Sequence, residues 1–327
     1  MSGLEHGGRL AAARRRFPDA PQPWMDLSTG INPVPYPLPP LPPALFARLP
    51  DPDDLRRLQA VAAEAFGAPD PSMVAALPGT QAAISVLPLL FRAQNVAVVA
   101  PAYGEHAACW AASGAAVRAV SRPEELAGAE TGVLCNPNNP DGRRWPPEAL
   151  LPVARRVGLL IVDEAYLDLE PEMRSCAPLI AEAPQLLVLR SFGKSYGLAG
   201  LRLGFAIAAP PVAERLRGAF GPWPVSGPAL AIGERALLDG DWLRAAAERA
   251  RADAACLQLL LARAGLRVIG GTSLFLLGES DRAAEWCARL GEAGILVRSF
   301  EHAPAWLRFG LPGDEAAWRR LETVMRG

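Results

Sequence analysis

Residues 186–206, LLVLRSFGKSYGLAGLRLGFA, contain two short apolar runs that are joined by a more polar loop. The runs at 186–189 and 203–206 have the length and composition of strands that are buried on both faces of a sheet. The loop holds Lys194, the only lysine among the 33 lysine and arginine residues of the chain. A general bias toward arginine explains why lysine is absent elsewhere, but not why it is kept here. Lysine, unlike arginine, can lose a proton and attack a carbonyl carbon, so Lys194 is a candidate nucleophile.

The same loop has a second interpretation as a phosphate-binding P-loop. Gly193, Lys194 and Ser195 match the end of the motif GxxxxGK[ST]. The first glycine of that motif would fall on Val188, which lies inside the apolar run. We therefore do not expect an ATPase.

Working outward from this stretch, similar apolar runs alternate with segments that have helical patterns. A helix is expected from about Asp53, as its cap, to Phe66, with Gly67 at its end. This alternation predicts an α/β fold with a mainly parallel sheet that is covered on both faces. The other apolar runs lie at 74–77, 96–99, 132–135 and 159–162, and the other helical segments at 81–92, 105–113 and 147–157.

We expect a large domain over residues 51–210 and a smaller α+β domain over 211–327. After Pro210 and Pro211 the pattern changes to a long alanine-rich helix at about 242–264, followed by short alternating elements. Residues 1–50 are rich in proline and are expected to form an extended arm that contributes to the small domain and the active site. A disordered tail is the alternative, and the apolar residues of this segment, such as Trp24, disfavour it.

The composition argues against several classes of protein. A formal net charge of −1 gives no reason to expect a nucleic acid as partner. Five cysteines without a CxxC motif favour a reducing cytoplasm over disulfides, and three scattered histidines do not suggest a metal site. No apolar run has the length of a membrane span or a signal peptide, so we expect a soluble protein that is not exported and does not bind a membrane.

Polar residues follow four of the apolar runs, where open parallel sheets bind their ligands. Each group has a plain alternative as a capped turn, ordinary loop or solvated acid. Together they offer an anion cradle at a helix start, a lysine, a carboxylate and a phenol, which is what the phosphorylated aldehyde pyridoxal 5′-phosphate needs. The residues are Gly79, Thr80, Gln81, Asn139, Asp163, Tyr166, Ser191, Lys194 and Arg202.

On these motifs the chain resembles the fold-type I pyridoxal-phosphate enzymes, within them the branch of histidinol-phosphate aminotransferases and threonine-phosphate decarboxylases. The resemblance covers nearly the whole chain and implies a seven-stranded, mainly parallel sheet between helices. It implies that Lys194 forms the Schiff base, that Asp163 pairs with the pyridine nitrogen, and that Tyr166 and Asn139 contact the phenolic oxygen. The implied phosphate contacts are Gly79, Thr80, Gln81, Ser191 and Arg202, and Tyr103 is implied to stack on the ring.

The resemblance also implies contacts to the substrate. Asn32 in GINP and Arg308 in LRFGLP match residues that bind the substrate carboxylate, which suits a bidentate guanidinium. Arg298 in ILVRSF matches a contact to the acidic end of the substrate, with a surface salt bridge as the alternative.

Three positions depart from the family pattern. Gly193 stands where many relatives have a hydroxyl residue on the cofactor phosphate, and Asp141 replaces the threonine of NPTG. Leu49 stands where relatives often have a tyrosine that reaches the neighbouring subunit's cofactor. Fewer phosphate contacts are therefore expected, and a contribution from a second subunit at Leu49 stays open.

The N-terminal stretch EHGGRLAAARRRFP, followed by MDLSTGINP, resembles threonine-phosphate decarboxylases more than histidinol-phosphate aminotransferases. By that resemblance His6, Gly7 and Gly8 contact a phosphorylated substrate, and a mobile N-terminus is the alternative. The expected activity is decarboxylation of L-threonine O-3-phosphate to (R)-1-amino-2-propanol O-2-phosphate in cobalamin synthesis, by a cytoplasmic homodimer. Alternatives are an aminotransferase for histidinol phosphate or an aromatic amino acid, and a catalytically silent binding protein. The residues alone do not decide between decarboxylation and transamination.

Overall fold

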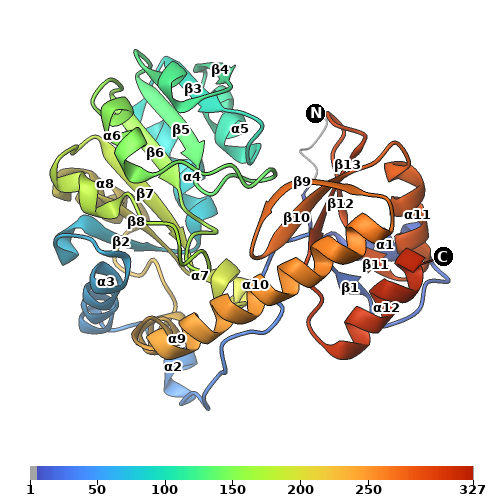
Figure 1. The fold of residues 1–327 in the computed structure, drawn as a ribbon. Helices are drawn as coiled ribbons and strands as arrows, with labels where there is room; N and C mark the ends of the chain where they lie inside the picture. The colour runs from blue at the N-terminus through green and yellow to red at the C-terminus, as the bar shows by residue number, and fades with distance from the viewer. Residues whose placement is uncertain (1–5, 327) are drawn as a thin grey trace. The chain divides into compact units, whose positions relative to one another are not determined.

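The computed structural model describes residues 6–326, which form two compact units (Figure 1). Unit 1 comprises residues 6–34, Pro140–Gly142 and 245–326, and unit 2 comprises Pro35–Asn139 and Arg143–Arg244. This division differs from the expected boundaries at 50 and 210, because residues 35–50 and 211–244 belong to unit 2. The reason is packing: one helix of the 211–244 segment packs against the helices at Pro52–Phe66 and Ala44–Ala47.

Unit 2 is built on a seven-stranded sheet in the order β2-β8-β7-β6-β5-β3-β4. Strand β8 pairs antiparallel with both β2 and β7, and all other pairs are parallel. The mainly parallel seven-stranded sheet is thus confirmed. The strands are β2 (Val74–Leu77), β3 (Asn95–Val99), β4 (Ala116–Val120), β5 (Thr131–Cys135), β6 (Leu159–Asp163), β7 (Leu186–Ser191) and β8 (Gly204–Ala208).

Helices cover both faces of this sheet (Figure 1), and each face has its own apolar cluster. Leu58, Leu150 and Leu230 belong to one cluster, and Ile84 and Trp110 to the other. Two-sided burial explains why the strands are continuously apolar instead of alternating. The helices are α2 (Ala44–Ala47), α3 (Pro52–Phe66), α4 (Thr80–Phe91), α5 (Glu105–Ala112), α6 (Pro147–Ala154), α7 (Phe192–Ser195), α8 (Pro210–Phe220) and α9 (Gly227–Leu238).

Unit 1 contains a four-stranded antiparallel sheet in the order β12-β13-β10-β9 and a separate parallel pair, β1-β11. Helix α10 (Gly240–Arg263) starts in unit 2 and continues into unit 1. The remaining elements are α1 (Leu10–Arg16), β1 (Met25–Asp26), β9 (Arg267–Thr272), β10 (Phe275–Glu279), α11 (Ala283–Glu292), β11 (Ile295–Leu296), β12 (Arg298–Ser299), β13 (Trp306–Gly310) and α12 (Glu315–Arg326).

The start of α3 shows how local chemistry fixes an element. Asp51, not the expected Asp53, is its N-cap: its carboxylate accepts a hydrogen bond of 2.8 Å from the Asp53 N–H. Pro52 takes the first helical position, which suits proline because no N–H is needed there. Gly67 ends the helix in the left-handed conformation, with φ of 69°.

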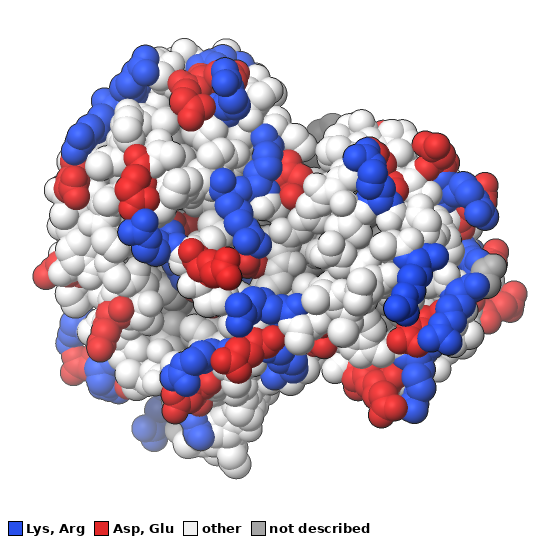
Figure 2. Space-filling model, viewed as in Figure 1, with Lys and Arg blue, Asp and Glu red and all other residues white. Residues whose placement is uncertain are grey.

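Two surface properties bear on partners. Figure 2 shows basic and acidic side chains interspersed on the face in view, so that face offers no single-sign patch for a polyanion. Within residues 6–326, no helix combines the length and apolar character that crossing a membrane requires.

Candidate active site

Unit 2 has a cavity of about 200 Å³ at the carboxyl ends of its strands. Parallel pairing brings these ends to one edge of the sheet, where the chain leaves each strand as a loop. All ten residues predicted to bind a cofactor line this cavity: Gly79, Thr80, Gln81, Tyr103, Asn139, Asp163, Tyr166, Ser191, Lys194 and Arg202. The structure brings these residues together, and their individual roles stay predictions.

One end of the cavity is shaped for an anion. Gly79 caps helix α4 with φ of 84°, and a Cβ atom there would lie 2.6 Å from Nη2 of Arg202. A Cβ atom on Gly204 would lie 2.7 Å from the Thr80 nitrogen. The two glycines therefore let a guanidinium and the N-terminus of a twelve-residue helix approach each other closely. Backbone N–H groups, the helix dipole and an arginine together favour a phosphate.

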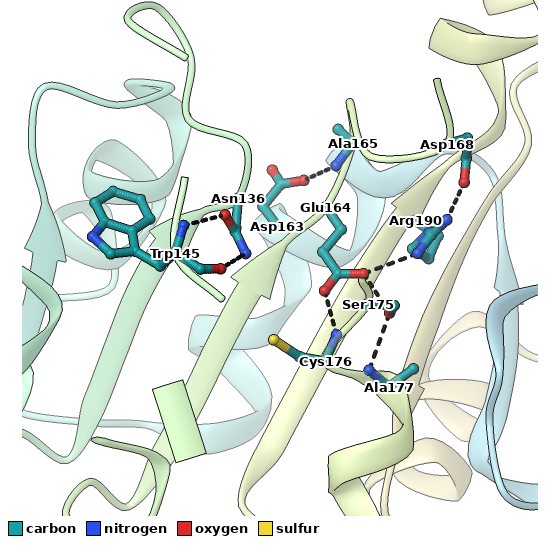
Figure 3. A network of polar contacts seen from close by, with 10 residues as sticks. All are labelled: Asn136, Trp145, Asp163, Glu164, Ala165, Asp168, Ser175, Cys176, Ala177 and Arg190. Atoms are coloured by element: carbon teal, nitrogen blue, oxygen red, sulfur yellow. Dashed lines mark hydrogen bonds and ion pairs between the residues drawn. The ribbon is translucent and has the colours of Figure 1, made fainter. Parts of the chain in front are cut away.

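The Asp163 carboxylate is held at both oxygens. Oδ1 accepts a hydrogen bond from the Ala165 N–H at 3.1 Å (Figure 3), and Oδ2 lies 2.9 Å from Nε2 of His106. Only 1% of His106 is exposed. These contacts fix the orientation of a carboxylate that ends β6 in the cavity, where it can hold a proton on a ring nitrogen.

Lys194 and the two tyrosines complete the cavity wall. The Nζ of Lys194, on the short helix α7, lies 5.5 Å from the ring centroid of Tyr166. The Tyr103 hydroxyl donates a hydrogen bond of 2.9 Å to Oε1 of Gln81. Burial raises the pKa of Tyr103, so this phenol keeps its proton and remains a donor. The Gln81 side chain thus holds Tyr103 at the cavity wall.

This set of groups fits a phosphorylated aromatic aldehyde such as pyridoxal 5′-phosphate. The anion cradle would hold the phosphate, Asp163 a protonated ring nitrogen, and Lys194 the aldehyde carbon. The described residues also contain one group with metal-ligating side chains close together, His106, Cys135 and Asp163, whose donor atoms lie within 4.8 Å of one another.

The predicted carboxylate ligands lie in unit 1. Arg308, in β13, is buried; its Nη2 donates a hydrogen bond of 2.6 Å to the Ser28 carbonyl, and its guanidinium lies 4.9 Å from the ring centroid of Phe275. Asn32 is also buried, and its Oδ1 accepts a hydrogen bond of 3.1 Å from the Val34 N–H. Arg298 is the β12 residue that pairs directly with Arg308 in the sheet register.

Unit 1 has its own cavity of about 300 Å³, and its lining includes His6, Gly7, Ser28, Arg298 and Ser299. The glycine pair is explained by packing on Ser28: a Cβ atom on Gly7 would lie 2.4 Å from the Ser28 carbonyl oxygen. The Gly8 N–H already donates to Ser28 Oγ at 2.8 Å. His6, Gly7 and Arg298 thus share a cavity, whereas the Gly8 amide has a partner within the protein.

Comparison with known proteins places the chain in a family. Residues 45–321 match the family model for aminotransferase class I and II. The chain belongs to this family. It is 46% identical to a threonine-phosphate decarboxylase from Sinorhizobium sp, over 98% of this chain and 97% of that one. It is 43% identical to a threonine-phosphate decarboxylase from Pseudomonas aeruginosa, over 99% and 98% of the two chains.

The fold matches that of solved structures. A histidinol-phosphate aminotransferase from Sinorhizobium meliloti, solved in complex with pyridoxal 5′-phosphate, superposes with a TM-score of 0.82 at 20% identity. The match covers 99% of this chain and 95% of that one. The fold-type I architecture predicted from the motifs is therefore confirmed.

The structure gives a physical reason for one of the departures from the family pattern, at Gly193, and describes the surroundings of the other two. A Cβ atom at Gly193 would lie 2.7 Å from Cα of Ala199, so the chain has no room there for a hydroxyl residue. Asp141 lies in a segment that packs on β9 so tightly that a Cβ atom on Gly270 would lie 2.0 Å from the Asp141 carbonyl oxygen. Leu49, the third departure, is exposed in the described chain.

The sequence did not predict His106 as a residue of this site. We considered His106 only as a metal ligand, yet its ring contacts the Asp163 carboxylate from 57 residues away in the chain. The one available signal was its position three residues after Tyr103, in the first turn of α5. The two rings lie next to each other, with their centroids 6.1 Å apart.

The Gly193 packing leads to a prediction. Gly193→Ser should destabilise the cofactor-free protein by about 1–3 kcal/mol, because the added Cβ and hydroxyl must displace the Ala199 backbone. Gly200→Ser is the matched control, since a Cβ atom at Gly200 meets nothing within 4 Å. Urea denaturation followed by circular dichroism measures both. Equal stability of the two variants would contradict the packing explanation.

Proposed function

We propose that this protein binds pyridoxal 5′-phosphate in the unit 2 cavity and decarboxylates L-threonine O-3-phosphate to (R)-1-amino-2-propanol O-2-phosphate. The observation that carries the cofactor assignment is the meeting of the only lysine with a carboxylate, a phenol and an anion cradle in one cavity. The substrate assignment is supported by two relatives of that activity that match at 43–46% identity over nearly their whole length.

In this proposal each cavity residue has a defined task. The amides at Gly79 and Thr80, with Ser191 and Arg202, hold the phosphate, and Tyr103 packs on the ring face. Asp163, oriented by His106 and Ala165, keeps a proton on the ring nitrogen. Tyr166 and Asn139 donate to the ring oxygen. The bound cofactor supplies an electron sink for the bond that breaks at the substrate Cα.

Residues of unit 1 would bind the acidic groups of the substrate. Arg308 has a planar guanidinium for bidentate contact with the carboxylate, and Asn32 adds an amide. Arg298 and His6, which line one cavity, supply positive charge and hydrogen-bond donors for the substrate phosphate. By orienting the substrate, these contacts would decide which group leaves Cα.

Lys194 would have a second task after carbon dioxide leaves. Its Nζ can return a proton to Cα, which completes decarboxylation. The alternative function, transamination of histidinol phosphate or an aromatic amino acid, would use the same amine to carry a proton away from Cα. We retain this alternative because the chain shares its fold with a histidinol-phosphate aminotransferase. A silent binding protein is disfavoured, because Lys194, Asp163 and Tyr166 are all retained.

We also propose a homodimer in the cytoplasm, acting in cobalamin synthesis. Four large apolar side chains are exposed on or beside α2 and α9, which pack together: Phe46, Leu49, Trp223 and Leu238. Apolar groups of this size favour a covered surface. All five cysteines are free thiols, which supports a reducing compartment.

The role of Lys194 can be tested chemically. Borohydride reduction of the cofactor-loaded protein should fix one cofactor covalently at Lys194, since the chain offers no other side-chain amine. Lys194→Ala should lose both the covalent product and the visible absorption band of the loaded protein. Peptide mass spectrometry locates the product. Covalent labelling in Lys194→Ala equal to that of the wild type would contradict the assignment.

The reaction itself is decided by one assay. The loaded protein should release carbon dioxide from L-threonine O-3-phosphate, and Arg308→Met should raise KM because the carboxylate contact is lost. Amino transfer to 2-oxoglutarate is measured in parallel with histidinol phosphate as donor. Amino transfer without release of carbon dioxide would replace the proposed function by the alternative.

The dimer can be tested by the molar mass in sedimentation velocity. The wild type should sediment as a dimer, and Phe46→Asp should shift it to the monomer because a charge is buried in an apolar contact. Leu259→Asp is the control, since Leu259 is also exposed but lies on α10. A wild type that sediments as a monomer would contradict this part of the proposal.

A further inference from the structure

Three charged side chains form a buried cluster beside the cavity, although none of them lines it. Arg190 bridges two carboxylates: its Nη1 donates to Oε2 of Glu164 at 2.9 Å and its Nη2 donates to Oδ1 of Asp168 (Figure 3). The exposed fractions of the side chains are 5% for Arg190, 0% for Glu164 and 5% for Asp168. We call these residues the Arg190 triad.

Further contacts hold the triad in place. Oε1 of Glu164 accepts a hydrogen bond of 2.7 Å from the Cys176 N–H, and Oε2 accepts one of 2.6 Å from the Ser175 hydroxyl. The Arg190 guanidinium lies 4.5 Å from the ring centroid of Phe66. Burial raises the pKa of Glu164, and the charge of Arg190 and the Cys176 N–H oppose that rise. Glu164 and Arg190 therefore each have partners in more than one segment.

Stability alone does not explain such a cluster. Removing two carboxylates and a guanidinium from water costs free energy that their attraction repays only in part. Apolar side chains of similar volume often give equal or greater stability at such positions. The triad therefore indicates a requirement for fixed geometry.

The geometry that the triad fixes is that of the cavity residues next to it in the chain. Glu164 follows Asp163, Arg190 precedes Ser191, and Asp168 lies two residues after Tyr166. Successive side chains at a strand end point to opposite sides, so Asp163 can face the cavity while Glu164 faces the triad. Asp163 also pairs with Leu189 across β6 and β7. One guanidinium thus links the segments that carry the carboxylate, the phenol and the hydroxyl.

We propose that the Arg190 triad is a positioning device for the cofactor: it fixes the spacing between Asp163, Tyr166 and Ser191, and so between the groups for the ring and the phosphate. This inference rests on the cofactor part of the proposed function. Its three members are positioning residues, because they act through their chain neighbours and touch no part of the cavity.

The test compares cofactor affinity with stability in an uncharged version of the triad. The triple variant Glu164→Gln, Asp168→Leu and Arg190→Met removes every charge and keeps an acceptor for the Cys176 N–H. We expect its cofactor-free melting temperature to stay near that of the wild type, while pyridoxal 5′-phosphate affinity falls at least about tenfold. Affinity is measured by titration of the visible absorption, and the pH midpoint of that absorption should shift as well.

If the triple variant does not fold, a second variant and a control still test the inference. Asp168→Asn keeps the volume and one hydrogen bond, and it should lower cofactor affinity at an unchanged melting temperature. Arg217→Met is the matched control: its guanidinium donates to the carbonyls of Ser72 and Val74, where β2 begins. This control should leave cofactor affinity unchanged.

If the triple variant folds and binds the cofactor with wild-type affinity, the inference is overturned and the proposed function stays intact. If the triple variant does not fold, wild-type affinity in Asp168→Asn has the same meaning. An equal fall in affinity for Arg217→Met also overturns it, since the effect would then follow stability. Failure of the wild type to bind the cofactor in the same titration overturns the proposed function, and the inference with it.

Discussion

The in-register parallel pairing of β5, β6 and β7 is the constraint on which the site depends. It sets Cys135, Asp163 and Leu189 in one row across the sheet. Strands β5 and β6 end in this row and β7 ends two residues beyond it, so their loops leave the sheet at the same edge and residues from distant parts of the chain meet there. The lysine follows β7, the carboxylate ends β6, and the asparagine loop follows β5. A shift of one residue in any pair would turn these side chains to the other face.

A sheet that is buried on both faces forces polar groups at its edge to find partners within the protein. Asn136 shows this well: its amide donates 2.9 Å to the Trp145 carbonyl and accepts 3.1 Å from the Trp145 N–H (Figure 3). Asp163 and Glu164 are satisfied in the same way by His106, Ala165 and Cys176. The hydrogen bonds that remove the cost of burial also fix the orientation of these side chains.

The sequence predicted best those features that depend on a local pattern, such as a strand and the polar residues that follow it. Continuous apolar runs predicted six of the seven strands of unit 2. The ten residues predicted to bind a cofactor, found in the loops between these runs, all line the cavity. Strand β4 was missed because it lies at the sheet edge and is largely exposed, so its pattern is not apolar. His106 and the Arg190 triad were missed because their contacts join residues 22 to 57 positions apart, and no local pattern encodes such pairings.

The arginine-rich composition and the single lysine follow from one physical difference. A guanidinium keeps its charge in any environment and has a planar fork, so Arg190 can bridge two buried carboxylates and Arg202 can lie against the Gly79 backbone. Neither task requires loss of a proton. Attack on an aldehyde does, because only a neutral amine is a nucleophile. A drift from lysine to arginine is therefore tolerated wherever charge alone matters, and it stops at position 194, where the proton has to leave.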